Sequence, residues 1–118
     1  MIQRNINFTF DKTNYQHMII DEVIHLSSDT VNYVTAHFDL DEQWNEFTNI
    51  YANWHTPHEM HQSEIDASGN TVVPSEILDT KADVRVNLQA DVIEDDLVKR
   101  RFTTYSVKAI VIDEDVEV

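Results

Sequence analysis

Three histidines, His55, His58 and His61, follow one another at intervals of three residues and are the first side chains whose types and spacing could do chemistry. On a helix, this spacing would place three imidazole rings along one face, where they could bind zinc. Pro57 and the strand-like sequence before it argue against a helix, and in a strand His58 would lie opposite the other two. The segment His58–His61 is also one residue too short for the zinc-protease signature. We therefore expect no metal site and no cofactor.

Catalytic motifs built on glycine are excluded because the chain contains a single glycine, Gly69. The nucleophile elbow, the phosphate-binding loop and the dinucleotide fingerprint all need at least two glycines at fixed spacing. The absence of cysteine removes thiol nucleophiles, thiolate metal sites and disulfides. The remaining Ser, His and Asp residues form no recognisable catalytic set, and we expect no catalytic residues and no enzymatic activity.

The chain is strongly acidic, with 22 Asp and Glu against 8 Lys and Arg and a formal net charge of −14. Such a surface repels nucleic-acid phosphates and anionic membranes and suits basic protein partners. The one dense basic stretch, Lys99–Arg101, follows the acidic Glu94–Asp96, and we expect the two to pair across a turn. No apolar run approaches the roughly 20 residues of a membrane span, and the first six residues do not resemble a signal peptide. Neither a nucleic-acid partner nor a membrane is expected.

The elements that would position these side chains are mostly short strands. Apolar residues alternate with polar ones at period two, and turn-forming residues separate the alternating segments at regular intervals. Expected strands cover residues 6–10, 17–26, 34–40, 50–54, 84–90 and 105–111, with turns at 11–14, 27–30, 41–45, 66–70 and 94–96. The segment Pro74–Leu78 is expected to form one short helical turn. This pattern predicts an all-β sandwich of about seven strands in one domain, residues 1–118, whose residues 113–118 form an acidic flexible tail.

Five aromatic residues are expected to be buried in the core, since aromatic side chains at strand spacing are more often core than ligand platforms. These residues are Phe38, Trp44, Phe47, Trp54 and Tyr105. The alternative is that they stack on sugar rings at one face of the sandwich. That alternative requires Trp44 or Trp54 to be exposed beside a groove.

The N-terminal third of the chain carries more apolar residues than one sandwich face needs. The surplus residues are Ile19, Ile20, Val23 and Ile24. Exposed apolar patches commonly mark protein–protein contacts, so these four residues are the expected interaction surface.

From about residue 30 to residue 112 the order of features resembles a small immunoglobulin-like domain family of tailed bacteriophages. That family includes the N-terminal domain of baseplate upper proteins and short stand-alone phage proteins. The matching features are the strand Val34–Leu40, the acidic step Asp41–Trp44, the strand Phe47–Trp54, the segment Val73–Leu78, the strand Asp83–Ala90 and the segment Thr104–Val107. Of these, Val73–Leu78 is similar to the family's Val-Pro-x-Glu-hydrophobic-Leu pattern.

The resemblance implies an immunoglobulin-like sandwich and a non-enzymatic structural or assembly protein of a phage virion, associated with the tail or baseplate. It implies action through contacts with other virion proteins or with further copies of the same chain. The alternative is a carbohydrate- or receptor-binding sandwich of a virion fibre or head decoration protein.

Overall fold

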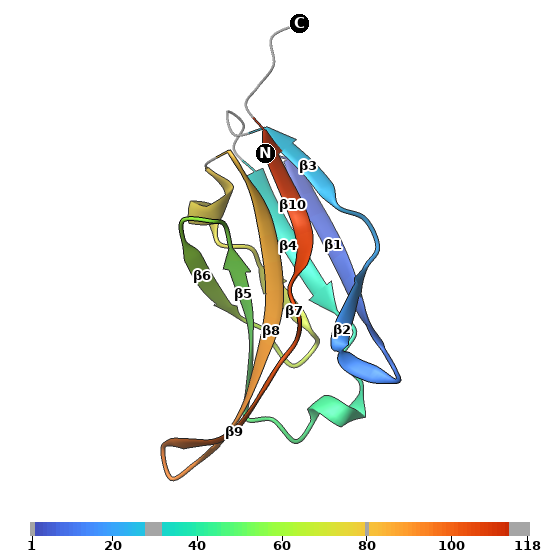
Figure 1. Cartoon of the computed structure of the whole chain (residues 1–118), viewed down its shortest axis with the longest axis vertical. Coiled ribbons are helices and arrows are strands. Elements are labelled where there is room, and N and C mark those ends of the chain that lie inside the picture. The colour runs from blue at the N-terminus through green and yellow to red at the C-terminus, as the bar shows by residue number, and fades with distance from the viewer. Residues whose placement is uncertain (1, 28–31, 80, 114–118) are drawn as a thin grey trace, which may run out of the picture.

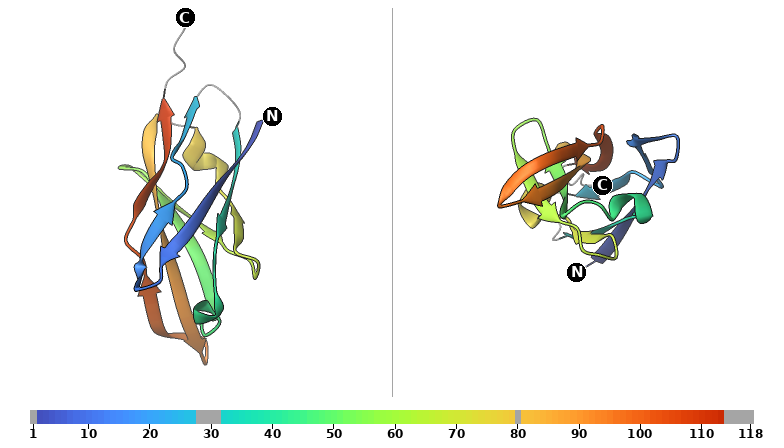
Figure 2. Two further views of the ribbon diagram at one scale, coloured as in Figure 1. Left: turned by 90° about the vertical axis from the view of Figure 1, so that its right-hand side faces the viewer. Right: turned by 90° about the horizontal axis from the view of Figure 1, so that it is seen from below.

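The computed structural model describes residues 2–27, 32–79 and 81–113, and these residues form ten strands and two short 3-10 helices (Figure 1). The strands divide into two sheets that pack as a sandwich (Figure 2). The all-β sandwich expected from the sequence is confirmed. It contains more strands than the seven expected because residues 60–64, 70–72 and 97–103 also form strands and the expected strand 17–26 is divided between the two sheets.

The smaller sheet contains, in spatial order, β2 (Asn14–Ile20), β1 (Ile2–Asp11), β4 (Asn32–Phe38) and β7 (Asn70–Val72). The larger sheet contains β3 (Ile24–Ser27), β10 (Val107–Asp113), β8 (Ala82–Glu94), β5 (Asn49–His55) and β6 (Met60–Glu64), and β9 (Leu97–Thr103) pairs with the far half of β8. Most neighbouring strands are antiparallel, whereas β1 and β4, and β3 and β10, pair in parallel.

One core lies between the two sheets, and the inward-facing alternate side chains of β1, β4, β5 and β8 contribute to it. Phe8 of β1 and Phe38 of β4 are fully buried, and their rings stack with centroids 4.5 Å apart. The larger sheet contributes Trp54 of β5 and the inward side of β8, where Val84, Val86, Leu88 and Ala90 have no exposed surface. Burial of apolar area on this scale is the main stabilising term of a domain of this size.

The expected single strand over residues 17–26 is wrong. The chain leaves the smaller sheet after β2 ends at Ile20, and it enters the larger sheet as β3 at Ile24. The break is held by Asp21, whose backbone N–H donates to the carbonyl of Asn7 at 3.1 Å and whose carboxylate accepts hydrogen bonds from the Asn7 side chain and backbone. A continuous strand could not contribute side chains to both sheets.

Alternation over residues 105–111 predicts one face made of Tyr105, Val107, Ala109 and Val111, and this prediction is wrong in the second half of the strand. Pairing between β10 and β8 shifts register between Lys108 and Ile110, which leaves Ala109 as an extra residue. Because a bulge of one residue reverses which side chains face inward, Ile110 and Ile112 are buried and Val111 is only half-buried.

The glycine-containing turn at residues 66–70 is expected to close a hairpin, but it joins β6 of the larger sheet to β7 of the smaller one. Gly69 has φ +87°, a conformation that favours glycine, and its carbonyl accepts a hydrogen bond of 2.8 Å from the backbone N–H of Phe38. Asp66 organises the turn by accepting from the backbone N–H groups of Ser68 and Asn70. The expected helical turn at Pro74–Leu78 is present as η2 (Ser75–Leu78).

The expected acidic tail lies outside the described residues apart from Asp113, the last residue of β10. None of the helical segments within the described ranges has the length and apolar character needed to cross a membrane.

Candidate functional site

The most distinctive part of the molecule is the end of the sandwich at which β8 and β9 project, which we call the arm end (Figure 1). Trp44 of η1 (Glu42–Trp44) lies at the centre of an aromatic cluster there and is 4% exposed. Its ring centroid lies 4.9 Å from that of Phe10, 5.8 Å from that of Phe102 and 5.9 Å from that of Phe47. Strands β1 and β9 and the loop before β5 therefore meet around one side chain.

Asp41 positions this cluster because it is the N-cap of η1 and also binds two side chains of the β1–β2 hairpin. Its Oδ1 accepts from the backbone N–H of Gln43 at 3.0 Å. Its Oδ2 accepts from Lys12 Nζ at 2.9 Å and from the Tyr15 hydroxyl at 2.7 Å. The hydrogen bonds from Lys12 and Tyr15 hold the pKa of Asp41 below its usual value. This carboxylate therefore has a structural role.

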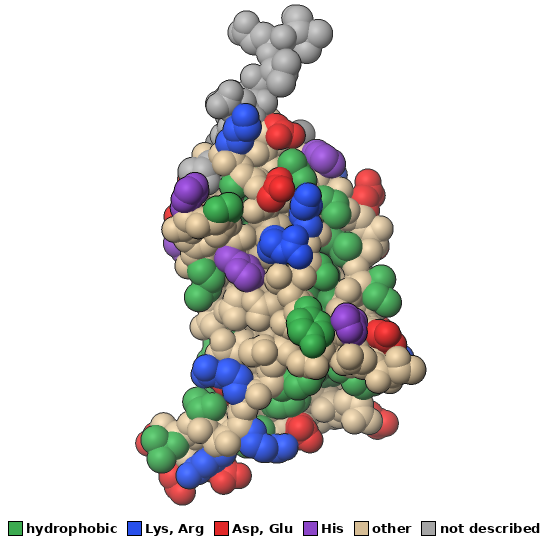
Figure 3. All heavy atoms as spheres, in the orientation of Figure 1, with side chains coloured by type: hydrophobic (Ala, Val, Ile, Leu, Met, Phe, Trp, Pro, Cys, Tyr) green, Lys and Arg blue, Asp and Glu red, His purple; other side chains and the backbone are tan. Residues whose placement is uncertain are grey.

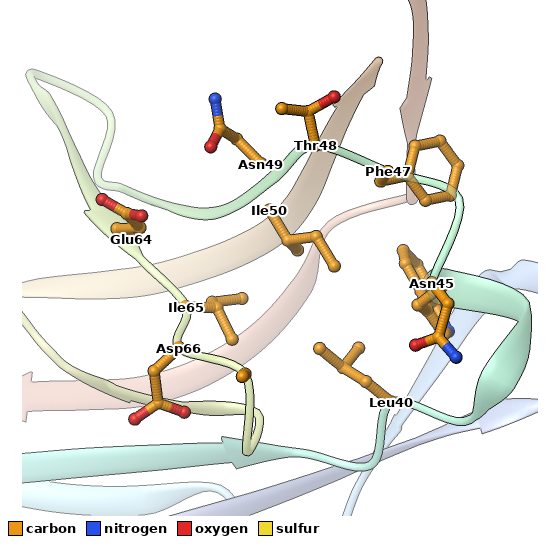
Figure 4. A pocket seen from close by; sticks show the side chains of 11 residues that line it. Leu40, Asn45, Phe47, Thr48, Asn49, Ile50, Glu64, Ile65 and Asp66 are labelled. Atoms are coloured by element: carbon orange, nitrogen blue, oxygen red, sulfur yellow. The ribbon is translucent and has the colours of Figure 1, made fainter. Parts of the chain in front are cut away.

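Beside the cluster, a pocket of about 360 Å³ opens between the two sheets. We call it the end pocket. Leu40, Ile50 and Ile65 point toward one another in its interior, and Phe47 stands at one side (Figure 4). Glu64 and Asp66 line the pocket, and Figure 4 shows their carboxylates pointing away from its centre. The pocket is therefore apolar where Leu40, Ile50 and Ile65 meet, whereas Asn45, Thr48, Asn49, Glu64 and Asp66 make the rest of its lining polar.

The second feature of this end is a two-stranded arm, residues 92–100. Strand β8 pairs with β5 only as far as Asp91, whereas it pairs with β9 as far as Glu94, so the arm extends beyond the sandwich (Figure 1). Asp95 and Asp96 have φ of 53° and 63°, the left-handed pair that a two-residue type I′ hairpin turn requires.

The arm exposes apolar side chains next to basic ones. Leu97 is 60% exposed and Val98 is 48% exposed. Lys99, Arg100 and Arg101 follow them directly on β9, and Figure 3 shows hydrophobic, basic and acidic side chains together at this end of the molecule.

The expected pairing of Lys99–Arg101 with Glu94–Asp96 is not what the structure shows. Arg101 forms its ion pair with Asp91 at 2.8 Å, and Arg100 lies 3.7 Å from Glu46. Cross-strand register explains this difference, because Arg101 lies directly opposite Asp91 whereas Glu94 lies opposite Leu97.

Of the five aromatic residues expected in the core, Phe38, Trp44 and Trp54 are buried and Phe47 is half-buried in the aromatic cluster. The expectation for Tyr105 is wrong, since this side chain is 55% exposed and packs on His17 with ring centroids 5.0 Å apart. Its neighbour Thr104 takes the inward position, where its hydroxyl accepts from the backbone N–H of Leu88 at 2.8 Å.

The expected interaction surface at Ile19, Ile20, Val23 and Ile24 is not one continuous patch. Ile24 is 4% exposed and belongs to the core, because β3 adds it to the larger sheet beside Ile110. Ile20 and Val23 are half-buried, and only Ile19 is well exposed, at 54%. Alternation along β2 turns Ile20 inward and Ile19 outward.

The three histidines lie around the tight turn between β5 and β6. His55 ends β5 opposite Met60, His58 is in the turn, and His61 lies opposite Trp54. Burial, and secondarily the charge of Arg85, lowers the pKa of His55. Within residues 2–27, 32–79 and 81–113, no three His, Cys, Asp or Glu side chains are grouped closely enough to hold a metal ion.

Leu97 and Val98 were not identified as interaction residues from the sequence. The available signal was the pair of apolar residues placed directly after the acidic turn Glu94–Asp96, at the start of a basic segment. Their exposure depends on β8 being longer than β5, which the local sequence does not show.

No protein-family model matches the sequence, and no curated protein matches it. Among solved structures, the chain is similar to the N-terminal domain of phage TP901-1 ORF48, with a TM-score of 0.59 and 10% sequence identity. The similarity covers 97% of this chain and 100% of that domain. The resemblance drawn from the sequence is therefore confirmed at the level of the fold: the chain has the architecture of a phage β-domain.

Proposed function

We propose that this protein is a structural or assembly component of a bacteriophage virion, associated with the tail or baseplate, and that it acts through protein–protein contacts without catalysis. The observation that carries the proposal is the likeness to the phage ORF48 domain, which spans nearly the whole of both chains.

Two features noted in the sequence support the same proposal. The acidic step before Trp44 forms η1, and the Val-Pro segment forms η2, so both segments of the phage resemblance are defined structural elements. Two carboxylates at the arm end, Asp41 and Asp91, have structural partners. Asp41 caps η1, and Asp91 binds Arg101.

The surface supports action through protein contacts. The arm exposes the apolar side chains of Leu97 and Val98, and the chain as a whole carries a charge of −14. An acidic surface with local apolar patches favours a virion partner that presents basic residues around an apolar contact.

Sugar binding, the alternative drawn from the sequence, required Trp44 or Trp54 to be exposed beside a groove. Trp44 is 4% exposed and Trp54 has no exposed surface, so neither indole can stack on a sugar ring. We therefore do not adopt carbohydrate binding as the function.

The test is native mass spectrometry of the purified chain mixed, one at a time, with the virion proteins encoded beside its gene. We expect a complex of fixed stoichiometry with at least one of them. As a second readout, antibodies against the chain should label purified particles. Absence of any complex, together with unlabelled particles, would contradict the proposal.

A further inference from the structure

A second pocket at the arm end, which we call the aromatic pocket, is lined mainly by aromatic rings. Its volume is about 160 Å³, which is roughly five times the ~30 Å³ that one water molecule occupies in the liquid. Its lining comes from β2, η1, the loop after η1 and β9, and consists of Tyr15, Gln43, Trp44, Glu46, Phe47 and Phe102. Four of these side chains are aromatic and one is a carboxylate.

The rings of the aromatic pocket are arranged as a floor and walls. Trp44, which is 4% exposed, is the floor. The ring planes of Tyr15 and Phe102 stand at 84° and 75° to the indole, and their centroids lie 6.3 and 5.8 Å from its centroid. The ring of Phe47 is tilted by 47° at a centroid distance of 5.9 Å. Because these three rings are only half-buried, the pocket presents aromatic surface from several directions.

Aromatic surface of this kind attracts organic cations. The face of an aromatic ring carries negative partial charge, and a cation within about 6 Å of the ring centroid is stabilised by it. The chain already contains one such contact, because Lys12 Nζ lies 5.4 Å from the centroid of Tyr15. Lys12 does not line the aromatic pocket, so its charge lies outside the space between the four rings.

Glu46 adds a formal negative charge to the aromatic pocket. Its carboxylate lies 3.7 Å from Arg100, and both side chains are more than half exposed. Exposed ion pairs of this length contribute little, so the carboxylate can bind another cation. Among the described Lys and Arg residues, none lines the pocket. The charge of −14 on the whole chain also raises the local concentration of cations.

We propose that the aromatic pocket binds an organic ammonium group, with the charge held by the ring faces and Glu46 and the alkyl carbons packed against the rings. Two sources share this chemistry: the side chain of a lysine on a partner protein, and a quaternary ammonium headgroup such as that of choline. The site is independent of the proposed virion role. A chain that binds these cations but is absent from virions would contradict that role alone.

The test is a titration of the ¹⁵N-labelled chain followed by NMR through its two indole N–H signals. The probes are choline chloride and N-acetyl-lysine methylamide, added at constant ionic strength. Their uncharged counterparts are 3,3-dimethylbutan-1-ol and N-acetyl-norleucine methylamide. The Trp54 signal is the internal reference, because Trp54 has no exposed surface, donates to Ser63 and does not line the pocket.

We expect at least one of the two cations to shift the Trp44 signal saturably and to leave the Trp54 signal in place. The uncharged counterpart of that cation should bind at least about threefold more weakly, because it keeps the apolar contact and loses the attraction to the ring faces and Glu46. The cation with the smaller dissociation constant identifies the source, lysine side chain or quaternary ammonium.

Two variants separate the contributions of charge and ring. Glu46→Gln should weaken binding of the cation at least about threefold. Its matched control is Glu42→Gln, which changes the net charge equally at an exposed residue of η1 that does not line the pocket. Phe47→Leu keeps an apolar side chain but removes one ring, and it should weaken binding by a similar factor. Thermal melts should show that all three variants fold, and the glutamate pair decides the test if Phe47→Leu does not.

Three results would overturn the proposal. The first is that neither cation shifts the Trp44 signal saturably. The second is that the uncharged counterparts bind as tightly as the cations, since the pocket would then recognise apolar groups alone. The third is that Glu42→Gln weakens binding as much as Glu46→Gln does, since this would show an effect of overall charge without a site at the aromatic pocket.

Discussion

Arg101 of β9 donates two hydrogen bonds to Asp91 of β8 at the base of the arm. The guanidinium Nε lies 2.8 Å from Oδ1, and Nη2 lies 3.3 Å from Oδ2. The carboxylate is 5% exposed and also accepts from Gln89 Nε2 at 3.2 Å. The chain of hydrogen bonds continues across the outer face of the larger sheet, since Asn53 donates to Gln89 and Gln62 donates to Asn53. Side-chain hydrogen bonds therefore connect β9, at the base of the arm, through β8 to β5 and β6.

This pair predicts a pH dependence of stability. The hydrogen bonds from Arg101 lower the pKa of Asp91 below that of an aspartate in an unfolded chain, about 3.9. The unfolded chain therefore binds a proton at a higher pH than the folded chain does. The stabilisation is fully present above the unfolded pKa and is lost as the pH falls below about 4 and through the folded pKa. Denaturant melts at pH 7, 5, 4 and 3 should show this loss.

Arg101→Gln should reduce the loss on acidification, since Asp91 then has no cationic partner. Arg100→Gln is the matched control, because Glu46, the partner of Arg100, is largely exposed and lies at 3.7 Å. If Arg101→Gln and wild type lose the same free energy of unfolding between pH 5 and pH 3, the ion pair does not produce the pH dependence.

Trp44→Ala should destabilise the fold by about 3–5 kcal/mol, the range for emptying a buried aromatic site. The indole lies at the centre of the aromatic cluster and is 4% exposed. Equilibrium denaturant melts measure this change. A loss below about 1 kcal/mol would show that Trp44 lies at the surface in solution.

The two tryptophans should respond differently to replacement by phenylalanine. Among the described residues, Trp44 Nε1 is buried without a hydrogen-bond partner, whereas Trp54 Nε1 donates to Ser63 Oγ at 2.9 Å. Trp54→Phe removes that bond and leaves Ser63 without its indole donor. It should therefore cost about 1 kcal/mol more than Trp44→Phe, as measured by the same melts. Equal costs would mean that the Trp54 hydrogen bond adds nothing.

Gly69→Ala should cost at least about 2 kcal/mol. The backbone φ of +87° strains any residue with a Cβ, and a Cβ at this position would clash with the Phe38 carbonyl oxygen. Ser68→Ala, at an exposed position in the same turn, should stay within about 0.5 kcal/mol of wild type. If the two variants have the same free energy of unfolding, the turn adopts another conformation in solution.

Thermal melts with and without a chelator should superimpose. His55, His58 and His61 lie at separate points around the β5–β6 turn, and His55 Nε2 is buried. A melting temperature that falls on chelation, or rises with added zinc, would show a metal site at this turn.

The sequence alone determined the all-β class, the inward faces of β1, β4, β5 and β8, and the turns at residues 41–45 and 74–78. Each of these follows from local chemistry. Alternation at period two needs only the pleat of a strand, as in Val84–Ala90, and turns form where residues such as Asp41 and Pro74 favour them. The charge of −14, and the preference for basic partners that it indicates, also come directly from composition.

Only the tertiary structure decided which strands are neighbours, and therefore which side chains are left exposed. The separation of β2 from β3 placed Ile24 in the core, the bulge at Ala109 reversed the inward face of β10, and the length of β8 relative to β5 exposed Leu97. The end pocket gathers Leu40, Ile50 and Ile65 from three segments of the chain. Pairing and register depend on contacts between residues far apart in the sequence, which local periodicity cannot encode.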